Sequence, residues 1–116
     1  MRKFDTGATR DDDTSKPNYT GFLAPEVLAR YARYMLRHQK QADGQMRAAD
    51  NWKKGIPRQA YMESMHRHFM EVWALHQLEA DMPEAVPVAF DAAMDEAICA
   101  LLFNVMCYMY EQEKGR

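Results

Sequence analysis

The stretch AICALLFNVMCYMY, residues 97–110, decides the fold of this chain. Read as a helix, it is apolar on nearly every face, and Asn104 is its only strongly polar side chain. A helix of this kind must be buried on all sides. Three helices seldom surround one of their own number, so the apolar faces left over predict a partner chain, in a homodimer or a tetramer.

Apolar residues at helical spacing predict two more long helices before this one. The first begins at Ala24 or Pro25, since proline is favoured in the first helical turn, and ends near residue 41. The second covers about residues 58–78, and the third, after Pro83 and Pro87, about residues 88–113. The residues expected to face inward are Val27, Leu28, Tyr31, Met35 and His38 in the first helix, and Met62, Met65, Phe69, Val72 and His76 in the second.

No window alternates in the manner of a strand, so the predicted class is all-α, a small helical bundle of about three main helices. Residues 1–24 lack periodicity and are expected to form an extended arm that only docking would order. The chain is expected to be a single domain, residues 1–116, with its helical body at residues 25–113. The stretch AADNWKKGIP, residues 48–57, predicts a loop with a short turn of helix.

Composition and charge narrow the classes of function. The formal net charge is −2, and the 15 Lys and Arg residues are spread along the chain, which argues against nucleic-acid binding. The N-terminal residues hold no apolar core of a signal peptide, and residues 97–110 are shorter than the ~20 needed to cross a bilayer. We therefore expect a cytoplasmic protein with no membrane contact, in which Cys99 and Cys107 are small core thiols.

Candidate metal ligands cluster on the second predicted helix. Glu63 and Glu71 lie along one face at helical spacing, and His68 and Glu71 form an i, i+3 pair. Carboxylates and imidazoles one turn apart can chelate one divalent ion. The alternative is a solvated face with ion pairs.

The third predicted helix adds Asp95 and Glu96 before its apolar run. Asn104 must find partners inside a core, because an unsatisfied buried polar group costs ~1–3 kcal/mol. If Glu96 and Asn104 share a pocket with the second helix, the result is an acidic site suited to Mg²⁺ and to phosphate hydrolysis.

Cations and aromatic residues outside the helices could bind a nucleotide. Arg10 and Lys16 in the arm, and Lys54 in the loop, could meet phosphate oxygens. Trp52 could stack on a base. The alternatives are a packing role for Trp52 and solvated surface cations.

Three blocks of sequence resemble a known family: GATRDDDTSKPNY (residues 7–19), DNWKKGIP (50–57) running into YMESMHRHFMEVW (61–73), and DEAICALLFNVMCYMYE (95–111). Together they resemble the phage and prophage family described as dATP/dGTP diphosphohydrolase, N-terminal domain, over about residues 7–111. Its pattern corresponds here to Gly7, Ala8, Arg10, Asp11, Lys16, Asn51, Trp52, Gly55, Arg67, His68 and residues 101–104.

The resemblance extends to the MazG-like all-α pyrophosphohydrolases, which hold Mg²⁺ with Glu-x-x-Glu on one helix and Glu-x-x-Asp on the next. The chain departs from that pattern. His68 and Glu71, or Glu63 and His66 one turn earlier, stand where two glutamates are expected, and Ala93 stands three residues before Glu96. Asp91, Asp95 and Glu96 are the alternative acidic residues, in a different register. The resemblance implies a Mg²⁺ site, with Mn²⁺ as the alternative ion. The expected catalytic residues are Glu71 and Glu96, with Glu63, Asp95 or His68 as further ligands.

The resemblance implies hydrolysis of a purine deoxynucleoside triphosphate, dGTP or dATP, to monophosphate and pyrophosphate by a homo-oligomer in the cytoplasm, that of the host if a phage encodes it. The expected substrate-binding residues are Arg10, Lys16, Asn51, Trp52, Lys54, Arg67 and Asn104. The alternative is a non-catalytic helical module that binds a nucleotide or another protein.

Overall fold

The computed structural model describes residues 1–85 and 89–115. These residues form two compact units, 1–30 and 31–116, which are treated separately below. The described elements are mostly helical, with three long helices, so the predicted all-α class is confirmed. The predicted start of the third helix, Val88, lies outside the described residues.

The first unit contains a small hairpin that the sequence pattern did not predict. Strands β1 (Arg2–Lys3) and β2 (Thr9–Arg10) pair antiparallel, with Arg2 opposite Arg10. The chain reverses near Gly7, whose φ is +89°. Strands of two residues are too short to show alternation, which explains why the expected arm had no strand in it.

A single helical turn, α1 (Tyr19–Phe22), follows the hairpin, and the Oδ1 of Asn18 accepts a hydrogen bond from the Gly21 amide at 2.9 Å at its start. Helix α2 (Pro25–Arg37) begins at the predicted proline. Val27 and Leu28, predicted to face inward, are about half exposed, which corrects that part of the predicted row.

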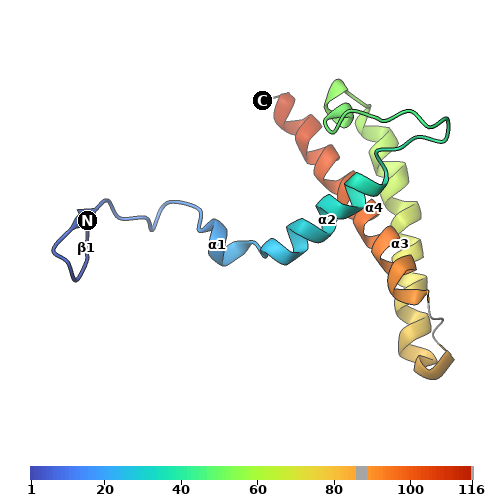
Figure 1. Ribbon diagram of the computed structural model, residues 1–116, viewed down its shortest axis with the longest axis horizontal. Helices are drawn as coiled ribbons and strands as arrows, with labels where there is room; N and C mark the ends of the chain where they lie inside the picture. The colour runs from blue at the N-terminus through green and yellow to red at the C-terminus, as the bar shows by residue number, and fades with distance from the viewer. Residues whose placement is uncertain (86–88, 116) are drawn as a thin grey trace. The chain divides into compact units, whose positions relative to one another are not determined.

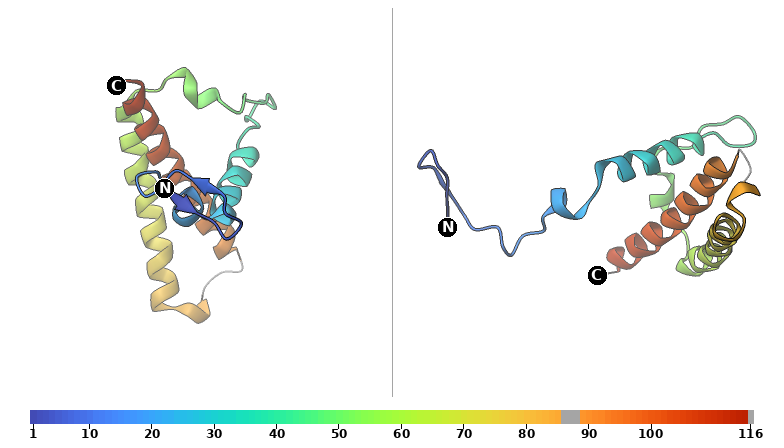
Figure 2. Two further views of the ribbon diagram at one scale, coloured as in Figure 1. Left: turned by 90° about the vertical axis from the view of Figure 1, so that its left-hand side faces the viewer. Right: turned by 90° about the horizontal axis from the view of Figure 1, so that it is seen from below.

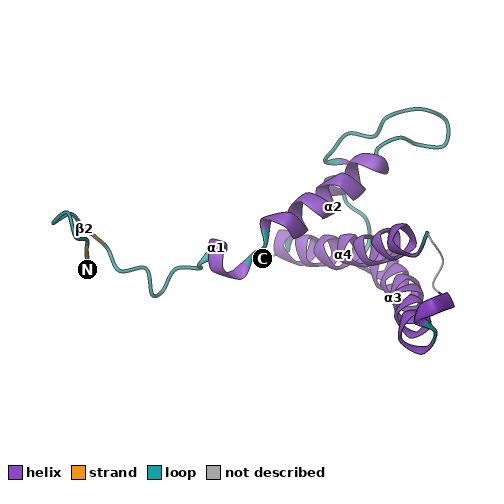
Figure 3. Cartoon of the chain, turned by 60° about the horizontal axis from the view of Figure 1, so that its bottom comes forward, coloured by secondary structure: helices purple, strands orange, loops and turns teal. Residues whose placement is uncertain are grey.

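Helix α2 ends four residues before the predicted boundary, because the backbone of the next residues makes other hydrogen bonds. The Gln41 amide donates to the Gln45 carbonyl at 2.8 Å, and the Arg47 amide donates to the Gln39 carbonyl at 2.7 Å. A tight turn at Gly44, with φ of +84°, makes this pairing possible. The loop then leads to the 3₁₀ turn η1 (Asn51–Lys54), the short helical turn that the sequence predicted. Figure 3 shows this loop between α2 and α3.

Helix α3 (Arg58–Asp81) and helix α4 (Phe90–Lys114) lie side by side and antiparallel in the second unit (Figures 1 and 2). The start of α3 directly after Pro57 is as predicted, and its end lies three residues beyond the predicted one. The 3₁₀ turn η2 (Pro83–Ala85) follows α3.

The core lies along α4 and consists largely of small residues. Cys99 and Ala100 of α4 pack against Tyr34 of α2, and the half-buried Phe103 joins them. Both cysteines are buried thiols, as predicted. Small side chains at these positions allow neighbouring helices to approach α4 closely.

The row of α3 that is turned inward differs from the predicted one. Tyr61 is buried, and Met65, His68, Val72 and Leu75 continue its row in steps of three and four residues with partial burial. Phe69, predicted to face inward, is about half exposed, and His76 is exposed as well. The predicted row was correct at Met65 and Val72 and one residue out of register at Phe69 and His76.

Among the described helices, α4 alone is long and apolar enough to cross a membrane by length and composition. Of its most apolar 18 residues, 28% are buried. The core helices of water-soluble proteins meet the same criterion, so this finding is weak evidence for a membrane span.

Candidate functional site

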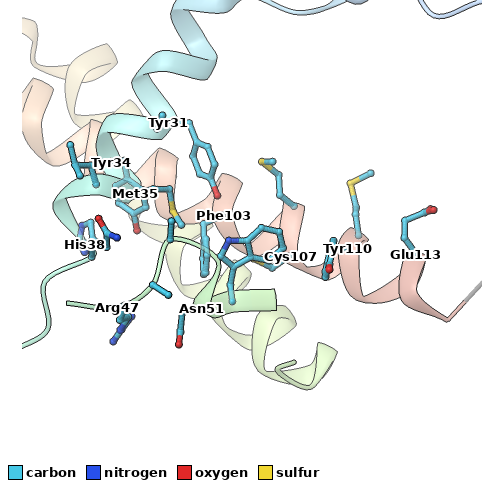
Figure 4. Close-up of a pocket in the computed structure, with 18 residues that line it drawn as sticks. Tyr31, Tyr34, Met35, His38, Arg47, Asn51, Phe103, Cys107, Tyr110 and Glu113 are labelled. Carbon is cyan, nitrogen blue, oxygen red and sulfur yellow. The ribbon is translucent and has the colours of Figure 1, made fainter. Parts of the chain in front are cut away.

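An open pocket of about 770 Å³ lies in the second unit, between the C-terminal half of α2, the loop before α3 and the C-terminal half of α4. Its size falls within the range of ~300–1,000 Å³ that is typical of small-molecule sites. Figure 4 labels these lining residues: Tyr31, Tyr34, Met35 and His38 from α2 and its end, Arg47 and Asn51 from the loop, and Phe103, Cys107, Tyr110 and Glu113 from α4. Trp52 lines it as well.

The loop is held against α4 by an aromatic contact. The rings of Trp52 and Tyr110 meet edge to face, with centroids 4.8 Å apart and planes at 77°. Gly55 ends the 3₁₀ turn with φ of +110°, a conformation that side chains other than glycine rarely adopt. The Asn-Trp-x-x-Gly block therefore has a geometric role, which is to place Asn51 and Trp52 at the pocket.

Two tyrosines of α2 form the opposite wall. The rings of Tyr31 and Tyr34 are stacked with centroids 6.4 Å apart, and the His38 ring lies 4.4 Å from that of Tyr34. Burial raises the pKa of Tyr31 to about 12, and the neighbouring Cys107 adds to this effect. The Tyr31 hydroxyl is therefore a neutral hydrogen-bonding group at any physiological pH.

Cations flank the aromatic residues. Arg47 lines the pocket. The Nζ of Lys53 lies 5.4 Å from the centre of the Trp52 ring, and the Nζ of Lys114 lies 5.6 Å from that of Tyr110. Both lysines thus stand beside the aromatic pair. Lys114 is paired with Glu111 Oε2 at 2.9 Å, so the charge of Lys53 is the one that favours an anionic ligand there.

Two of the predicted metal ligands, Asp95 and Glu96, are engaged in ion pairs beside the pocket. The Nη2 of Arg37 lies 2.7 Å from Asp95 Oδ2 and 3.0 Å from Glu96 Oε1, and the Nε2 of His38 lies 2.6 Å from Glu96 Oε2. Partial burial raises the pKa of Glu96, but the hydrogen bonds from His38 and Arg37 outweigh that effect and leave the pKa lowered. These carboxylates link α2 to α4.

The other predicted ligands lie on α3. The Nδ1 of His68 and the Oε2 of Glu71 are 3.1 Å apart, and the Oε1 of Glu63 accepts a hydrogen bond from Gln59 at 3.3 Å. Burial raises the pKa of Tyr34, with further contributions from Glu96 and, more weakly, Glu71. Glu71 and Glu96 therefore both act on Tyr34.

These residues do not form a metal site. Within residues 1–85 and 89–115, no three His, Cys, Asp or Glu side chains are arranged to hold an ion. The predicted ligands are instead divided between ion pairs on α3 and ion pairs between α2 and α4. A Mg²⁺ ion does not fit this arrangement of a single chain.

The remaining predicted substrate-binding residues lie outside the pocket. Asn104 is 5% exposed, and its Nδ2 donates to the Ala100 carbonyl of its own helix at 2.7 Å. Its printed hydrogen bond is therefore within α4, and it does not line the pocket that the sequence analysis had suggested for it. Lys54 and Arg67 are exposed and do not line the pocket, while Arg10 and Lys16 belong to the first unit.

The interpretation of the sequence missed several polar or aromatic residues of the pocket, namely Tyr34, Gln39, Arg47, Tyr110 and Glu113. Trp52 was the sequence signal that could have pointed to Tyr110, because an aromatic residue in a loop needs a packing partner on a helix. The proposed roles of Trp52 as a packing residue and as a pocket residue turn out to be compatible, since it contacts Tyr110 and also lines the pocket.

A buried polar pair lies behind the pocket wall, between α3 and α4. The Tyr61 hydroxyl and Glu111 Oε1 are buried and have no hydrogen bond of good geometry within the described residues. The Cys107 thiol is nevertheless close enough to Tyr61 to interact with its hydroxyl. Burial raises the pKa of Tyr61 and that of Cys107, so both groups are neutral near pH 7.

Comparison with known proteins gives one match. The model of the family described as dATP/dGTP diphosphohydrolase, N-terminal, matches residues 6–110, which include Asn51, Trp52 and Tyr110. No curated protein and no solved structure matches the chain.

Proposed function

We propose that this chain, which belongs to the dATP/dGTP diphosphohydrolase, N-terminal, family, binds a purine deoxynucleoside triphosphate in the pocket between α2, the loop and α4. The family supports the substrate class, and the pocket supports the place of binding. The observation that carries the proposal is the pocket itself, an open cavity of about 770 Å³ with aromatic and cationic side chains.

Each part of such a ligand has a suitable partner in the pocket. A purine is a flat aromatic ring system, which stacks well on a tyrosine ring such as that of Tyr31. The side-chain amide of Asn51 offers a donor and an acceptor for the base edge. The guanidinium of Arg47 can bind phosphate oxygens with two parallel hydrogen bonds.

The positive side chains beside the Trp52 and Tyr110 rings suit the triphosphate end of the nucleotide. Lys53 and Lys114 stand beside the Trp52 and Tyr110 rings, within 5.4 Å and 5.6 Å of the ring centres. Glu113 also lines the pocket and would repel a phosphate placed next to it. We therefore assign the phosphates to the Arg47 and Lys53 side and the base to the Tyr31 side.

The proposed reaction is the attack of water on a phosphorus of the triphosphate, which yields a deoxynucleoside monophosphate and pyrophosphate. The positive side chains would stabilise the charge that develops on the leaving pyrophosphate. Family membership supports this reaction. The ion pairs of Glu71 and Glu96 favour the second candidate, a domain that binds the nucleotide without cleaving it.

Binding is tested by fluorescence, because the chain has two tryptophans and Trp52 alone lines the pocket. In a Trp73→Phe background, titration with dGTP or dATP should change the Trp52 emission in a saturable way. Arg47→Ala should weaken binding by about 10-fold or more, since a hydrogen bond to a charged group contributes ~1.5–3 kcal/mol. Arg33→Ala, an exposed arginine of α2 outside the pocket, is the matched control.

Hydrolysis is tested by pyrophosphate release from ribo- and deoxynucleoside triphosphates with Mg²⁺, with Mn²⁺ and with chelator. Release that favours dGTP or dATP and needs the ion would support the enzyme, and its loss in Glu71→Gln or Glu96→Gln would support the catalytic roles expected for them. Saturable binding without release would support the binding module. An absence of purine nucleotide binding by the folded protein would refute both candidates.

A further inference from the structure

Two exposed methionines line the pocket from the C-terminal half of α4. Met106 and Met109 are 45% and 58% exposed. Because they are three residues apart, their side chains are neighbours on the same side of the helix. Solvent therefore reaches both side chains at the place where a ligand of the pocket would lie.

The other two sulfur-bearing side chains that line the described pocket are less accessible. Met35 of α2 is half-buried, and Cys107 is 2% exposed. Burial raises the pKa of the Cys107 thiol, whereas the thiolate is the form of cysteine that reacts with oxidants. An oxidant that enters the pocket therefore reacts first with the two methionines of α4.

Hydrogen peroxide oxidises a methionine thioether by transfer of one oxygen atom. A sulfur lone pair attacks a peroxide oxygen, so that an S–O bond forms and the O–O bond breaks. The hydroxide that leaves takes the proton of the transferred oxygen and becomes water. Sulfur loses two electrons, and the peroxide gains them. A methionine sulfoxide reductase reverses the change with a dithiol, which becomes a disulfide while the oxygen leaves as water.

A sulfoxide would change the wall that α4 contributes to the pocket. This wall also contains the aromatic rings of Phe103 and Tyr110, and Glu113 is its one charged group (Figure 4). A carboxylate accepts hydrogen bonds and cannot donate one to a sulfoxide oxygen. A ligand that covers the wall would remove water from the carboxylate's neighbours, including the sulfoxides, without a charged donor to replace it, and such burial is unfavourable.

The unoxidised thioethers have the opposite effect on an aromatic ligand. The sulfur of methionine is polarizable and makes favourable contacts with aromatic rings. Cys107, which lies between the two methionines in sequence, is close enough to Tyr31 to affect its pKa. The α4 wall is thus near the Tyr31 side of the pocket, where the purine is placed above.

We propose that Met106 and Met109 form a reversible oxidation site, at which peroxide converts two thioethers to sulfoxides and thereby lowers the affinity of the pocket for an aromatic ligand. The identity of that ligand, dGTP or dATP, rests on the proposed function. The oxidation itself does not, because it requires only the two exposed thioethers.

The test is treatment of the full chain with hydrogen peroxide, with the sulfoxides located by mass spectrometry of its peptides. Met106 and Met109 should oxidise at rates similar to those of Met70 and Met82, which are 55% and 51% exposed and do not line the pocket. Saturating dGTP should slow the oxidation of the first pair and leave that of the second pair unchanged.

Two double variants test the effect on affinity. The pocket variant is Met106→Leu/Met109→Leu, and the surface variant is Met70→Leu/Met82→Leu. Leucine has nearly the volume of methionine and cannot be oxidised in this way, and each protein is compared with its own untreated form. Peroxide should raise the dGTP dissociation constant by ~10-fold or more in the unmodified chain and in the surface variant, but by less than ~2-fold in the pocket variant. Methionine sulfoxide reductase with a dithiol should restore the affinity.

Equal losses of affinity in the two variants would overturn the proposal, as would an unchanged affinity after both pocket methionines have become sulfoxides. If dGTP does not bind the untreated chain, the proposed function fails separately. The oxidation site is then tested with anilinonaphthalene sulfonate, an aromatic anion whose binding in the pocket quenches the emission of Trp52. The same difference between the two variants is expected with this probe, and its absence would refute the oxidation site.

Discussion

Tyr31 couples the pocket to pH through its buried ring. Its pKa is raised to about 12 by burial, with Cys107, Tyr34 and Cys99 as the neighbouring titratable groups. The unfolded chain releases the phenolic proton near pH 10, whereas the folded chain holds it to about pH 12. The stability that this group contributes is therefore complete below pH 10 and declines as pH rises from about 10 to 12.

Between pH 10 and 12, the free energy of unfolding of Tyr31→Phe should decrease less than that of the unmodified chain. Phenylalanine cannot ionise, so this part of the pH dependence disappears, while the burial of Tyr34 and Tyr61 maintains the rest. Urea unfolding of both proteins at pH 8, 10, 11 and 12 measures it. Parallel curves for the two proteins would show that Tyr31 titrates normally in the folded chain.

Asn104 illustrates a buried polar residue that is satisfied by its own helix. Its Nδ2 donates to the Ala100 carbonyl, which already belongs to the backbone ladder of α4. Asn104→Leu should therefore change the free energy of unfolding by no more than about 1 kcal/mol and leave the nucleotide affinity unaltered. Thermal unfolding and the Trp52 titration check both parts. A selective loss of affinity would return Asn104 to the binding site.

Among the elements, α2 and α4 are joined by exposed ion pairs in which Glu96 is central. Arg37, His38 and Asp95 are the charged or titratable groups around it. The lowered pKa of Glu96 means that its contribution to stability is present above the ordinary value of 4.5 and is lost as pH falls through the lower, folded-state value. Glu96→Gln removes that contribution.

We therefore expect Glu96→Gln to be less stable than the unmodified chain at pH 7, with a difference that shrinks below pH 4.5 and in high salt. Salt matters because Glu96 and Arg37 are both about half exposed. Urea midpoints at pH 7 and at pH 3.5, with and without 1 M NaCl, measure the effect. Glu79→Gln, an exposed carboxylate of α3, serves as the control, and an equal pH dependence in both variants would count against this role of Glu96.

The loop before α3 depends on one glycine. Gly55→Ala should destabilise the chain by about 1–3 kcal/mol, because φ of +110° is strained for alanine. It should also weaken nucleotide binding, since the turn places Asn51 and Trp52 at the pocket. Gly44→Ala, at φ of +84° in the same loop, should destabilise without a comparable effect on affinity. Equal losses of affinity in the two variants would show that Gly55 has no particular role in placing Asn51 and Trp52 at the pocket.

Long elements were predictable because their signals are strong and local. Pro25 and Pro57 mark the starts of α2 and α3, and the apolar run at residues 97–110 identified α4. The β1–β2 hairpin and the backbone pairing of residues 39–47 could not be predicted, because segments this short have no periodicity. The pocket was predicted only at Asn51 and Trp52, since its other walls come from residues far apart in sequence.

The misjudged register of α3 has a consequence for the whole molecule. Phe69 was expected to face inward, but it is about half exposed and its ring contacts that of the equally exposed Trp73. The sequence correctly indicated that α4 has more apolar surface than a single chain buries. Periodicity alone could not say which side would stay open, because that depends on the rotation of α3 and α4 about their own axes.

At the scale of the whole molecule, the proposed nucleotide predicts an effect on thermal unfolding. A nucleotide that binds only the folded chain should stabilise it by ~2.7 kcal/mol at 100 times its dissociation constant. Thermal scans with and without dGTP measure the rise in melting temperature. Arg47→Ala should reduce that rise at the same dGTP concentration, whereas the control Arg33→Ala should not. An equal rise in Arg47→Ala and in the unmodified chain would place the nucleotide outside the pocket between α2, the loop and α4.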